Sequence, residues 1–107
     1  MRLFAIQVPG TANKHNRIAG KQFRDFLLQE IGGFNAREVS GAWRDEKTGR
    51  AHIEPMIEYQ FATDHKDMVL DIQARAAQLW PDEICFYVAE LGTASIVYPP
   101  QKTMVAQ

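Results

Sequence analysis

An alternation of residue character between Ala51 and Phe61 constrains the fold more than any other feature of this chain of 107 residues. One alternate set is Ala51, Ile53, Ile57, Tyr59 and Phe61, and the other is His52, Glu54, Met56, Glu58 and Gln60. A period of two predicts a strand whose first set covers the helices and whose second set lies on an open sheet face or against another subunit. Pro55 lacks an N–H group and predicts an edge position or a bulge near Glu54.

This strand is the second half of a predicted hairpin at the centre of the chain. Its partner strand is expected over Phe34–Arg44, and the polar segment Asp45–Arg50 joins the two, with Gly49 as the residue of positive φ. An earlier strand is expected over Arg2–Val8, because Pro9-Gly10 after it is a strong turn signal.

Two amphipathic helices are expected, one on each side of the hairpin. The first spans Ala19–Ile31 and ends at Gly32-Gly33, because glycine accepts the left-handed conformation that ends many helices. The polar segment Thr11–Arg17 before it is expected to be a flexible loop, either a solvated connection or a cover for a ligand. The second helix starts after Thr63 or Asp64 as the capping residue. Its buried stripe consists of Met68, Val69, Ile72, Ala76, Leu79 and Trp80.

A fourth strand is expected over Ile84–Ala89, centrally placed because it is almost entirely apolar, and strand structure resumes over Ala94–Tyr98. Strand-helix-strand twice predicts an α+β, ferredoxin-like β-α-β-β-α-β sandwich, with both helices on one face of an antiparallel sheet. We expect one domain over residues 1–100 and a C-terminal tail over 101–107. The polar set of the second sheet face is compatible with a solvated face, but Trp43, Met56 and the apolar fourth strand indicate that a partner partly covers it.

Charge and composition exclude several classes of function. The 12 basic and 13 acidic residues give a net charge of -1, which argues against binding to nucleic acid or to an anionic membrane. No apolar run is long enough to span a membrane, and no signal-peptide pattern is evident at the N-terminus. Cys85 is the only cysteine, so an intramolecular disulfide is impossible. We expect a cytoplasmic protein.

Motifs for common chemistry are absent from the sequence. There is no phosphate loop, no dinucleotide fingerprint, no metal-ligand spacing and no Ser-His-Asp arrangement. Cys85 is expected to be a small buried residue of a strand rather than a nucleophile. Glu90 ends an apolar strand just before Gly92-Thr93, so it is either a ligand-binding acid at the mouth of the sheet or an ordinary strand-end acid. Trp43 is likewise either a ligand-binding residue or an aromatic side chain that only packs, and Glu54 is either a ligand-binding residue or a solvated carboxylate.

Three segments carry a family resemblance: Ser40-Gly-Ala-Trp-Arg-Asp with Glu54 on the next strand, then Val69–Trp80, then Ile84–Tyr98. Together they resemble the bacteriophage enzymes that degrade S-adenosylmethionine (SAM), formerly called SAM hydrolases and now regarded as SAM lyases. The resemblance implies a PII-like subunit assembled as a homotrimer, with sites between subunits. It implies SAM as the substrate, no cofactor and no metal.

The resemblance also implies the site residues. Trp43 and Glu54 take the catalytic positions, and Glu90, Trp43, Met56 and Thr93 form the substrate-binding set. Trp43 stands where the family usually has Tyr, so no role that needs a phenolic hydroxyl is available there. An indole face attracts a sulfonium cation, and carboxylates accept hydrogen bonds from ribose hydroxyls or an ammonium group. Glu54 and Glu90 are therefore expected to bind and orient the substrate rather than to act as bases.

The implied reaction is an intramolecular attack of the SAM carboxylate on its own γ-carbon, giving homoserine lactone and methylthioadenosine. Such a reaction depends mainly on proximity. In the cytoplasm of a phage host, it would lower SAM and evade restriction. Three alternatives stay open: a SAM hydrolase giving homoserine, a non-catalytic PII-like trimeric sensor of adenine nucleotides, and a structural trimer in which the hairpin only mediates assembly.

Overall fold

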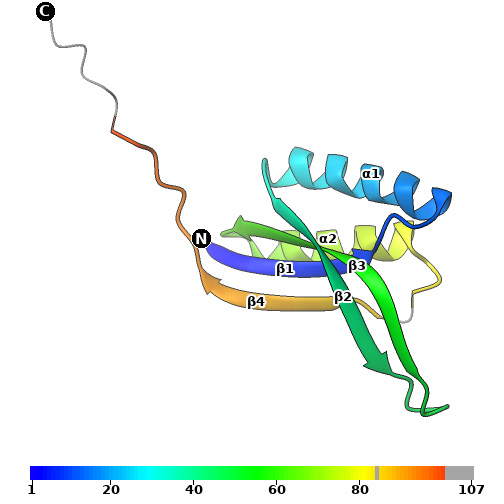
Figure 1. Ribbon diagram of the computed structural model, residues 1–107. Helices are drawn as coiled ribbons and strands as arrows, with labels where there is room; N and C mark the ends of the chain where they lie inside the picture. The colour runs from blue at the N-terminus through cyan, green and yellow to red at the C-terminus, as the bar shows by residue number, and fades with distance from the viewer. Residues whose placement is uncertain (84, 101–107) are drawn as a thin grey trace, which may run out of the picture.

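The computed structural model describes residues 1–83 and 85–100, and the predicted tail over 101–107 lies outside them. The elements are β1 (Arg2–Pro9), α1 (Lys14–Glu30), β2 (Asn35–Arg44), β3 (Ala51–Thr63), α2 (Lys66–Leu79) and β4 (Tyr87–Thr93). The strands form one antiparallel sheet in the order β2-β3-β1-β4. Both helices lie on the same face of this sheet (Figure 1), which confirms the predicted ferredoxin-like fold.

The core lies between the helices and the two central strands. Its largest fully buried side chains are Tyr59, Phe23, Phe61, Ile6, Leu27, Ile72 and Val8. Phe23 of α1 meets the rings of Tyr59 and Trp80 edge to face, with centroid separations of 5.4 and 5.6 Å. The period-two pattern of β3 and the helical spacing of Phe23 and Leu27 therefore bury their apolar sides against each other, as predicted.

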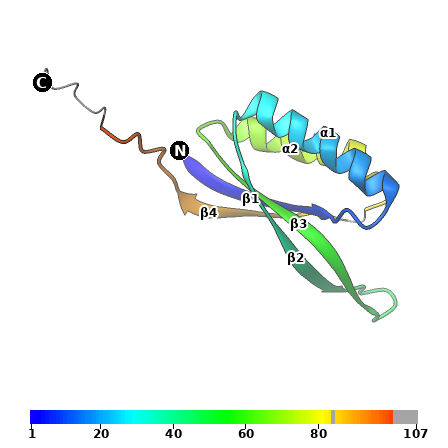
Figure 2. The same ribbon diagram turned by 45° about the horizontal axis from the view of Figure 1, so that its top comes forward.

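The β2–β3 hairpin is longer than the rest of the sheet. β1 accompanies β3 only as far as the Pro9–Met56 pair, and the remainder of the hairpin projects away from the helices (Figures 1 and 2). The prediction that Ile53 covers a helix is wrong, because neither α1 nor α2 reaches it and its side chain is 77% exposed. Pro55 immediately precedes the part of β3 that pairs with β1, which starts at Met56, so it lies where β3 has β2 as its one neighbouring strand in the described chain, as expected of a proline at an edge. Gly49 has the predicted positive φ, 73°.

The first helix begins five residues earlier than predicted. Asn13 is its N-cap, and the Asn13 side chain accepts a hydrogen bond of 2.8 Å from the backbone N of Asn16. Most of the expected flexible loop over Thr11–Arg17 is therefore helical, and a long cover for a ligand is not available there. Gly32, with φ of 91°, follows the C-cap residue Ile31, as the pair of glycines indicated.

The second helix begins later than predicted, at Lys66. The Thr63 hydroxyl accepts a hydrogen bond from His65 N at 3.1 Å, and Thr63 itself is still part of β3. His65 occupies the N-cap position without a side-chain capping bond. Neither Thr63 nor Asp64 is the cap, because the extended backbone of β3 continues to Thr63 before the chain turns.

The fourth strand differs most from the prediction. β4 begins at Tyr87 and pairs only with β1, so it is an edge strand and not a central one. The predicted strand over Ala94–Tyr98 is absent from the described structure. Ala94 N donates to Met1 O at 2.8 Å, and the chain then leaves the sheet (Figures 1 and 2). No further strand of the described chain lies beside this segment, so its apolar composition has no partner within the subunit.

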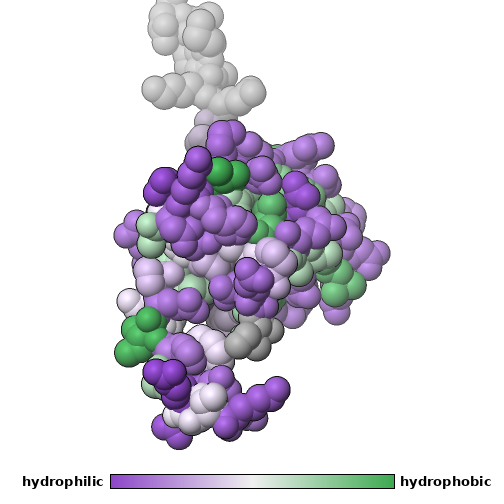
Figure 3. All heavy atoms as spheres, turned by 90° about the vertical axis from the view of Figure 1, so that its right-hand side faces the viewer, coloured by the Kyte–Doolittle hydropathy of each residue, from purple (hydrophilic) through white to green (hydrophobic). Residues whose placement is uncertain are grey.

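The surface seen from the hairpin side is mostly hydrophilic, with small separate hydrophobic patches (Figure 3). None of the helices described by the structure is long and apolar enough to cross a membrane.

Candidate functional site

A cavity of about 430 Å³ lies between the hairpin and the connection from α2 to β4. Its lining is Gln7, Ser40, Gly41, Ala42, Trp43, Glu54, Met56, Glu83, Cys85, Phe86 and Tyr87. The strand residues among them alternate with the residues that enter the core, so most of them belong to the sheet face opposite the helices. The cavity thus occupies the open face at the point where the sheet narrows to the hairpin.

Strand pairing places the hairpin residues of this cavity. Gly41 lies opposite Glu54, and Trp43 lies opposite His52. The rings of Trp43 and His52 are stacked, with centroids 4.6 Å apart and planes 17° apart. One face of the indole is therefore already occupied, which leaves its edge and other face for a ligand.

Gly41 of β2 leaves room for the side chain of Met56, which lies on the neighbouring strand β3. A Cβ atom at Gly41 would lie 3.0 Å from Met56 Cγ, closer than side-chain carbons normally approach. Met56 is 8% exposed and forms an apolar floor of the cavity between the two strands.

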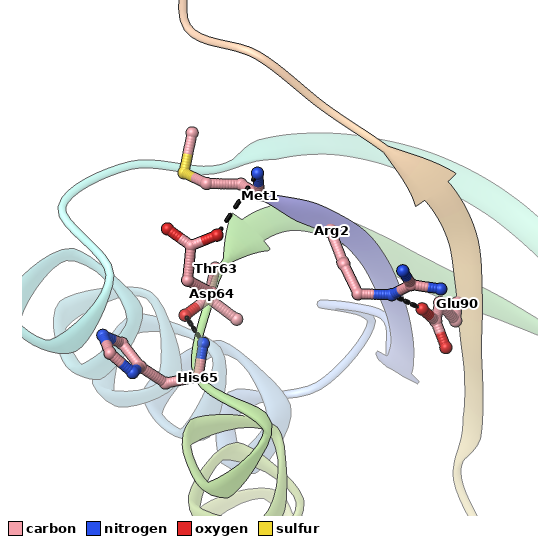
Figure 4. A network of polar contacts seen from close by, with 6 residues as sticks. All are labelled: Met1, Arg2, Thr63, Asp64, His65 and Glu90. Carbon is pink, nitrogen blue, oxygen red and sulfur yellow. Dashed lines mark hydrogen bonds and ion pairs between the residues drawn. The ribbon is translucent and has the colours of Figure 1, made fainter.

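The structure brings together three of the five residues predicted for the site. Trp43, Glu54 and Met56 all line the cavity. Glu90 and Thr93 lie at the opposite end of the sheet, where Glu90 pairs with Phe4 and Thr93 with Arg2. Figure 4 shows Glu90 directed at the guanidinium of Arg2, with which it forms an ion pair. Within one subunit, Glu90 and Thr93 do not join the other three residues.

The α2–β4 connection contributes Glu83, Cys85 and Phe86, none of which the sequence reasoning assigned to the site. Cys85 is an exposed free thiol that precedes β4, so the prediction of a buried strand cysteine is wrong. The strand topology could have indicated that this connection belongs to the site. In an antiparallel pair the start of β4 lies beside the end of β1, so the connection that precedes β4 faces the base of the hairpin.

The electrostatics of the cavity are negative. Its described lining contains the carboxylates of Glu54 and Glu83 and no Lys or Arg. Partial burial, and to a lesser degree the charge of Glu54, raise the pKa of the Glu83 carboxyl. Among the residues that the structure describes, no group of three or more His, Cys, Asp or Glu side chains is arranged to hold a metal ion.

A buried polar network adjoins the cavity through Gln7. Glu58 is 6% exposed and accepts hydrogen bonds from Gln60 at 2.9 Å, Arg37 at 3.0 Å and Gln7 at 3.1 Å. The hydrogen bond from Gln60, with those from Gln7 and Arg37 and the charge of Arg37, lowers the pKa of Glu58 despite the opposing effect of burial. The network fixes the polar part of the open face, because each of the two glutamate oxygens is engaged.

Comparisons with known proteins identify similar solved structures but no sequence family. No protein-family model matches the chain, and no curated protein matches it. The chain is similar to CutA1 from Pyrococcus horikoshii, with a TM-score of 0.62 and 16% identity over 91% of this chain and 87% of that one. The divalent cation tolerance protein CutA1 from Thermus thermophilus has a TM-score of 0.65 and 14% identity, covering 90% and 86% of the two chains.

A third neighbour is described as PII-like. It is the apo form of the PII-like protein CutA from Nostoc sp. PCC 7120, with a TM-score of 0.56 and 17% identity over 85% of this chain and 81% of that one. At such low identities these similarities show the fold, which is PII-like.

The same neighbours correct the family that the sequence resembles. They are CutA proteins and not phage SAM lyases, so the predicted membership of the SAM lyase family is wrong. The predictions of an enzyme, of SAM cleavage by a lyase and of a phage role in evading restriction are wrong with it. The hydrolase alternative is an enzyme too and is also set aside. The non-catalytic PII-like alternative agrees better with these neighbours.

Proposed function

We propose that this protein is a non-catalytic, PII-like binding module that holds a small ligand in the cavity between the hairpin and the α2–β4 connection. The observation that carries the proposal is the cavity itself. Its volume of about 430 Å³ lies in the range of small-molecule sites, and its apolar walls are combined with a few polar groups. Trp43, Glu54 and Met56 keep a place in the site as binding residues, without a catalytic role.

The lining favours a ligand with an aromatic ring and few negative charges. Trp43, Phe86 and Tyr87 offer rings against which a base such as adenine can pack. Glu54 and Glu83 would repel phosphate groups, and no basic side chain of the described lining compensates them. Among the alternatives from the sequence, the sensor of adenine nucleotides is thus supported as far as binding of the adenine ring is concerned. Binding of the nucleotide phosphates is disfavoured.

We also propose that the module is a homotrimer, the assembly expected of PII-like subunits with sites between them. Ile53 on the hairpin is 77% exposed, and Ile96, Val97 and Tyr98 beyond β4 are 63%, 82% and 80% exposed. Exposed apolar segments on projecting arms are typical of surfaces that another chain covers. The outer edges of β2 and β4 are unpaired within the described chain and offer backbone groups to a neighbour.

Calorimetric titration with adenosine and with ATP tests the ligand class. We expect adenosine to bind more tightly than ATP and to be recovered unchanged, because the site is acidic and non-catalytic. Trp43→Ala should weaken adenosine binding more than Trp43→Phe, which retains a ring. If neither adenosine nor ATP binds, the adenosine-like ligand class is refuted.

Sedimentation velocity tests the assembly separately. The parent protein should sediment as a trimer. The variant Val97→Ser/Tyr98→Ser should shift toward monomer, whereas Lys21→Ser on the exposed surface of α1 should not. A parent protein that stays monomeric at high concentration would refute the homotrimer.

A further inference from the structure

Two adjoining hollows share the same three side chains. The cavity described above is continued by a second hollow of about 250 Å³, lined by Trp43, Asp45, His52, Glu54, Asp82 and Glu83. Trp43, Glu54 and Glu83 line both hollows, so they stand at the boundary between them. One comes from β2, one from β3 and one from the α2–β4 connection, so the boundary depends on the tertiary fold.

The charge around this boundary is not balanced. The two hollows together present the carboxylates of Asp45, Glu54, Asp82 and Glu83, and no Lys or Arg of the described chain lines either of them. The ion pairs within residues 1–83 and 85–100 involve other acids, among them Glu58 and Glu90. Partial burial and, less strongly, the charge of the neighbouring Glu54 raise the pKa of the Glu83 carboxyl.

Aromatic and apolar groups stand beside these acids. Trp43 lines both hollows, and Phe86, Tyr87 and Met56 line the larger one. Aromatic faces attract cations, and carboxylates add a direct charge interaction. An inorganic cation fits less well, because the acids described by the structure are not grouped closely enough to ligate one ion. A bulky organic cation can contact separated carboxylates at the same time.

We propose that the cavity is selective for an organic cation, such as a quaternary or protonated amine, whose charged group lies between Glu54 and Glu83 beside Trp43. The apolar part of the ligand packs against Met56, Phe86 and Tyr87. This inference rests on the proposed binding function and adds to it the charge of the ligand.

A pair of probes of equal shape tests the role of charge. Choline and its neutral carbon isostere, 3,3-dimethylbutan-1-ol, differ in the replacement of a charged nitrogen by carbon. The chain has only two tryptophans, and Trp80 is buried in the core at 3% exposure, so its indole N–H signal is an internal reference for that of Trp43. In NMR titrations we expect choline to shift the Trp43 signal at a concentration about tenfold lower than the isostere, with Trp80 unmoved.

Substitution of Glu83 separates recognition of charge from support of the fold. Glu83→Gln should weaken choline binding several-fold and at the same time raise the melting temperature of the free protein at neutral pH, because it removes a partly buried charge and its repulsion from Glu54. A merely structural glutamate would not change both quantities in these directions. Glu54→Gln is the second variant, and Glu90→Gln, at the opposite end of the sheet, is the control that should leave choline binding unchanged.

The outcomes distinguish this inference from the proposed function. If choline and its isostere bind equally, or if Glu83→Gln and Glu54→Gln leave choline binding unchanged, the preference for a cation is refuted while the binding module stands. Failure of choline to bind refutes the cation site, and adenosine titration then decides the binding function independently. Binding of Mg²⁺ or Cu²⁺ at Trp43 without binding of choline would also overturn the inference.

Discussion

The two faces of the sheet have opposite relations to water. The helix-covered face is closed by large apolar side chains, and Phe23, Tyr59 and Leu27 on that side are fully buried. The open face has a hydrogen-bonded glutamate, a cavity and two carboxylates without an ion-pair partner among the described residues. The covered face therefore supplies most of the stability, because it buries the large apolar side chains. The open face, whose carboxylates add little to stability, is where we propose that a ligand binds.

The largest expected effect lies on the covered face. Phe23→Ala removes a ring that is 0% exposed and that contacts the rings of Tyr59 and Trp80. We expect the free energy of unfolding to fall by about 3–5 kcal/mol, because the lost contacts leave a cavity. Denaturant titration measures this, with Leu28→Ala on the half-exposed side of α1 as the control. A loss under about 1 kcal/mol for Phe23→Ala would contradict the view that this face supplies the stability.

A smaller effect is expected from the polar network of the open face. Glu58→Gln removes the charge that holds Arg37, whose Nη2 lies 2.9 Å from Glu58 Oε1. We expect a loss of about 1–2 kcal/mol in the free energy of unfolding, because the remaining buried groups are less well satisfied. Glu38→Gln on the exposed part of β2 is the matched control. Equal stability of Glu58→Gln and the parent protein would show that the network is not needed for the fold.

The same network predicts a dependence of stability on pH. The pKa of Glu58 is lower in the folded protein than its ordinary value of 4.5, so folding favours the ionised form. The resulting stabilisation is present above pH 4.5 and is lost as the pH falls through the folded-state pKa. The difference in unfolding free energy between the parent and Glu58→Gln should therefore shrink when the pH is lowered from about 6 to about 3. A constant difference over that range would refute the assignment.

The smallest effect on stability is expected from a substitution in the cavity of the open face. Gly41→Ala places a Cβ atom 3.0 Å from Met56 Cγ, and the flexible Met56 side chain can move aside. We expect a change of under about 1 kcal/mol in unfolding free energy but weaker ligand binding, because the cavity floor shifts. Gly33→Ala, which meets nothing within 4 Å, is the control. Unchanged ligand binding in Gly41→Ala would place the ligand away from Met56.

Local patterns in the sequence determined the order of elements and the core. Period-two spacing placed Tyr59 and Phe61 on the covered face, and three- and four-residue spacing did the same for Phe23 and Leu27, because these patterns depend only on the geometry of strands and helices. The turn at Gly49 and the end of α1 at Gly32 followed from the conformational freedom of glycine. The resemblance of segments to SAM lyases gave the PII-like fold but the wrong family.

Only the tertiary structure decided which side chains share the cavity. Trp43, Glu54 and Met56 were predicted together, but Glu83 and Phe86 join them through a connection whose course depends on the pairing of β4 with β1. The same antiparallel pairing carries Glu90 to the far end of the sheet. The alternating pattern likewise could not predict that Ile53 is exposed. It shows on which face of the sheet a side chain lies, but not whether a helix covers that part of the face. The sequence pattern places a residue along a strand, but contacts between elements far apart in the chain decide which residues share a site.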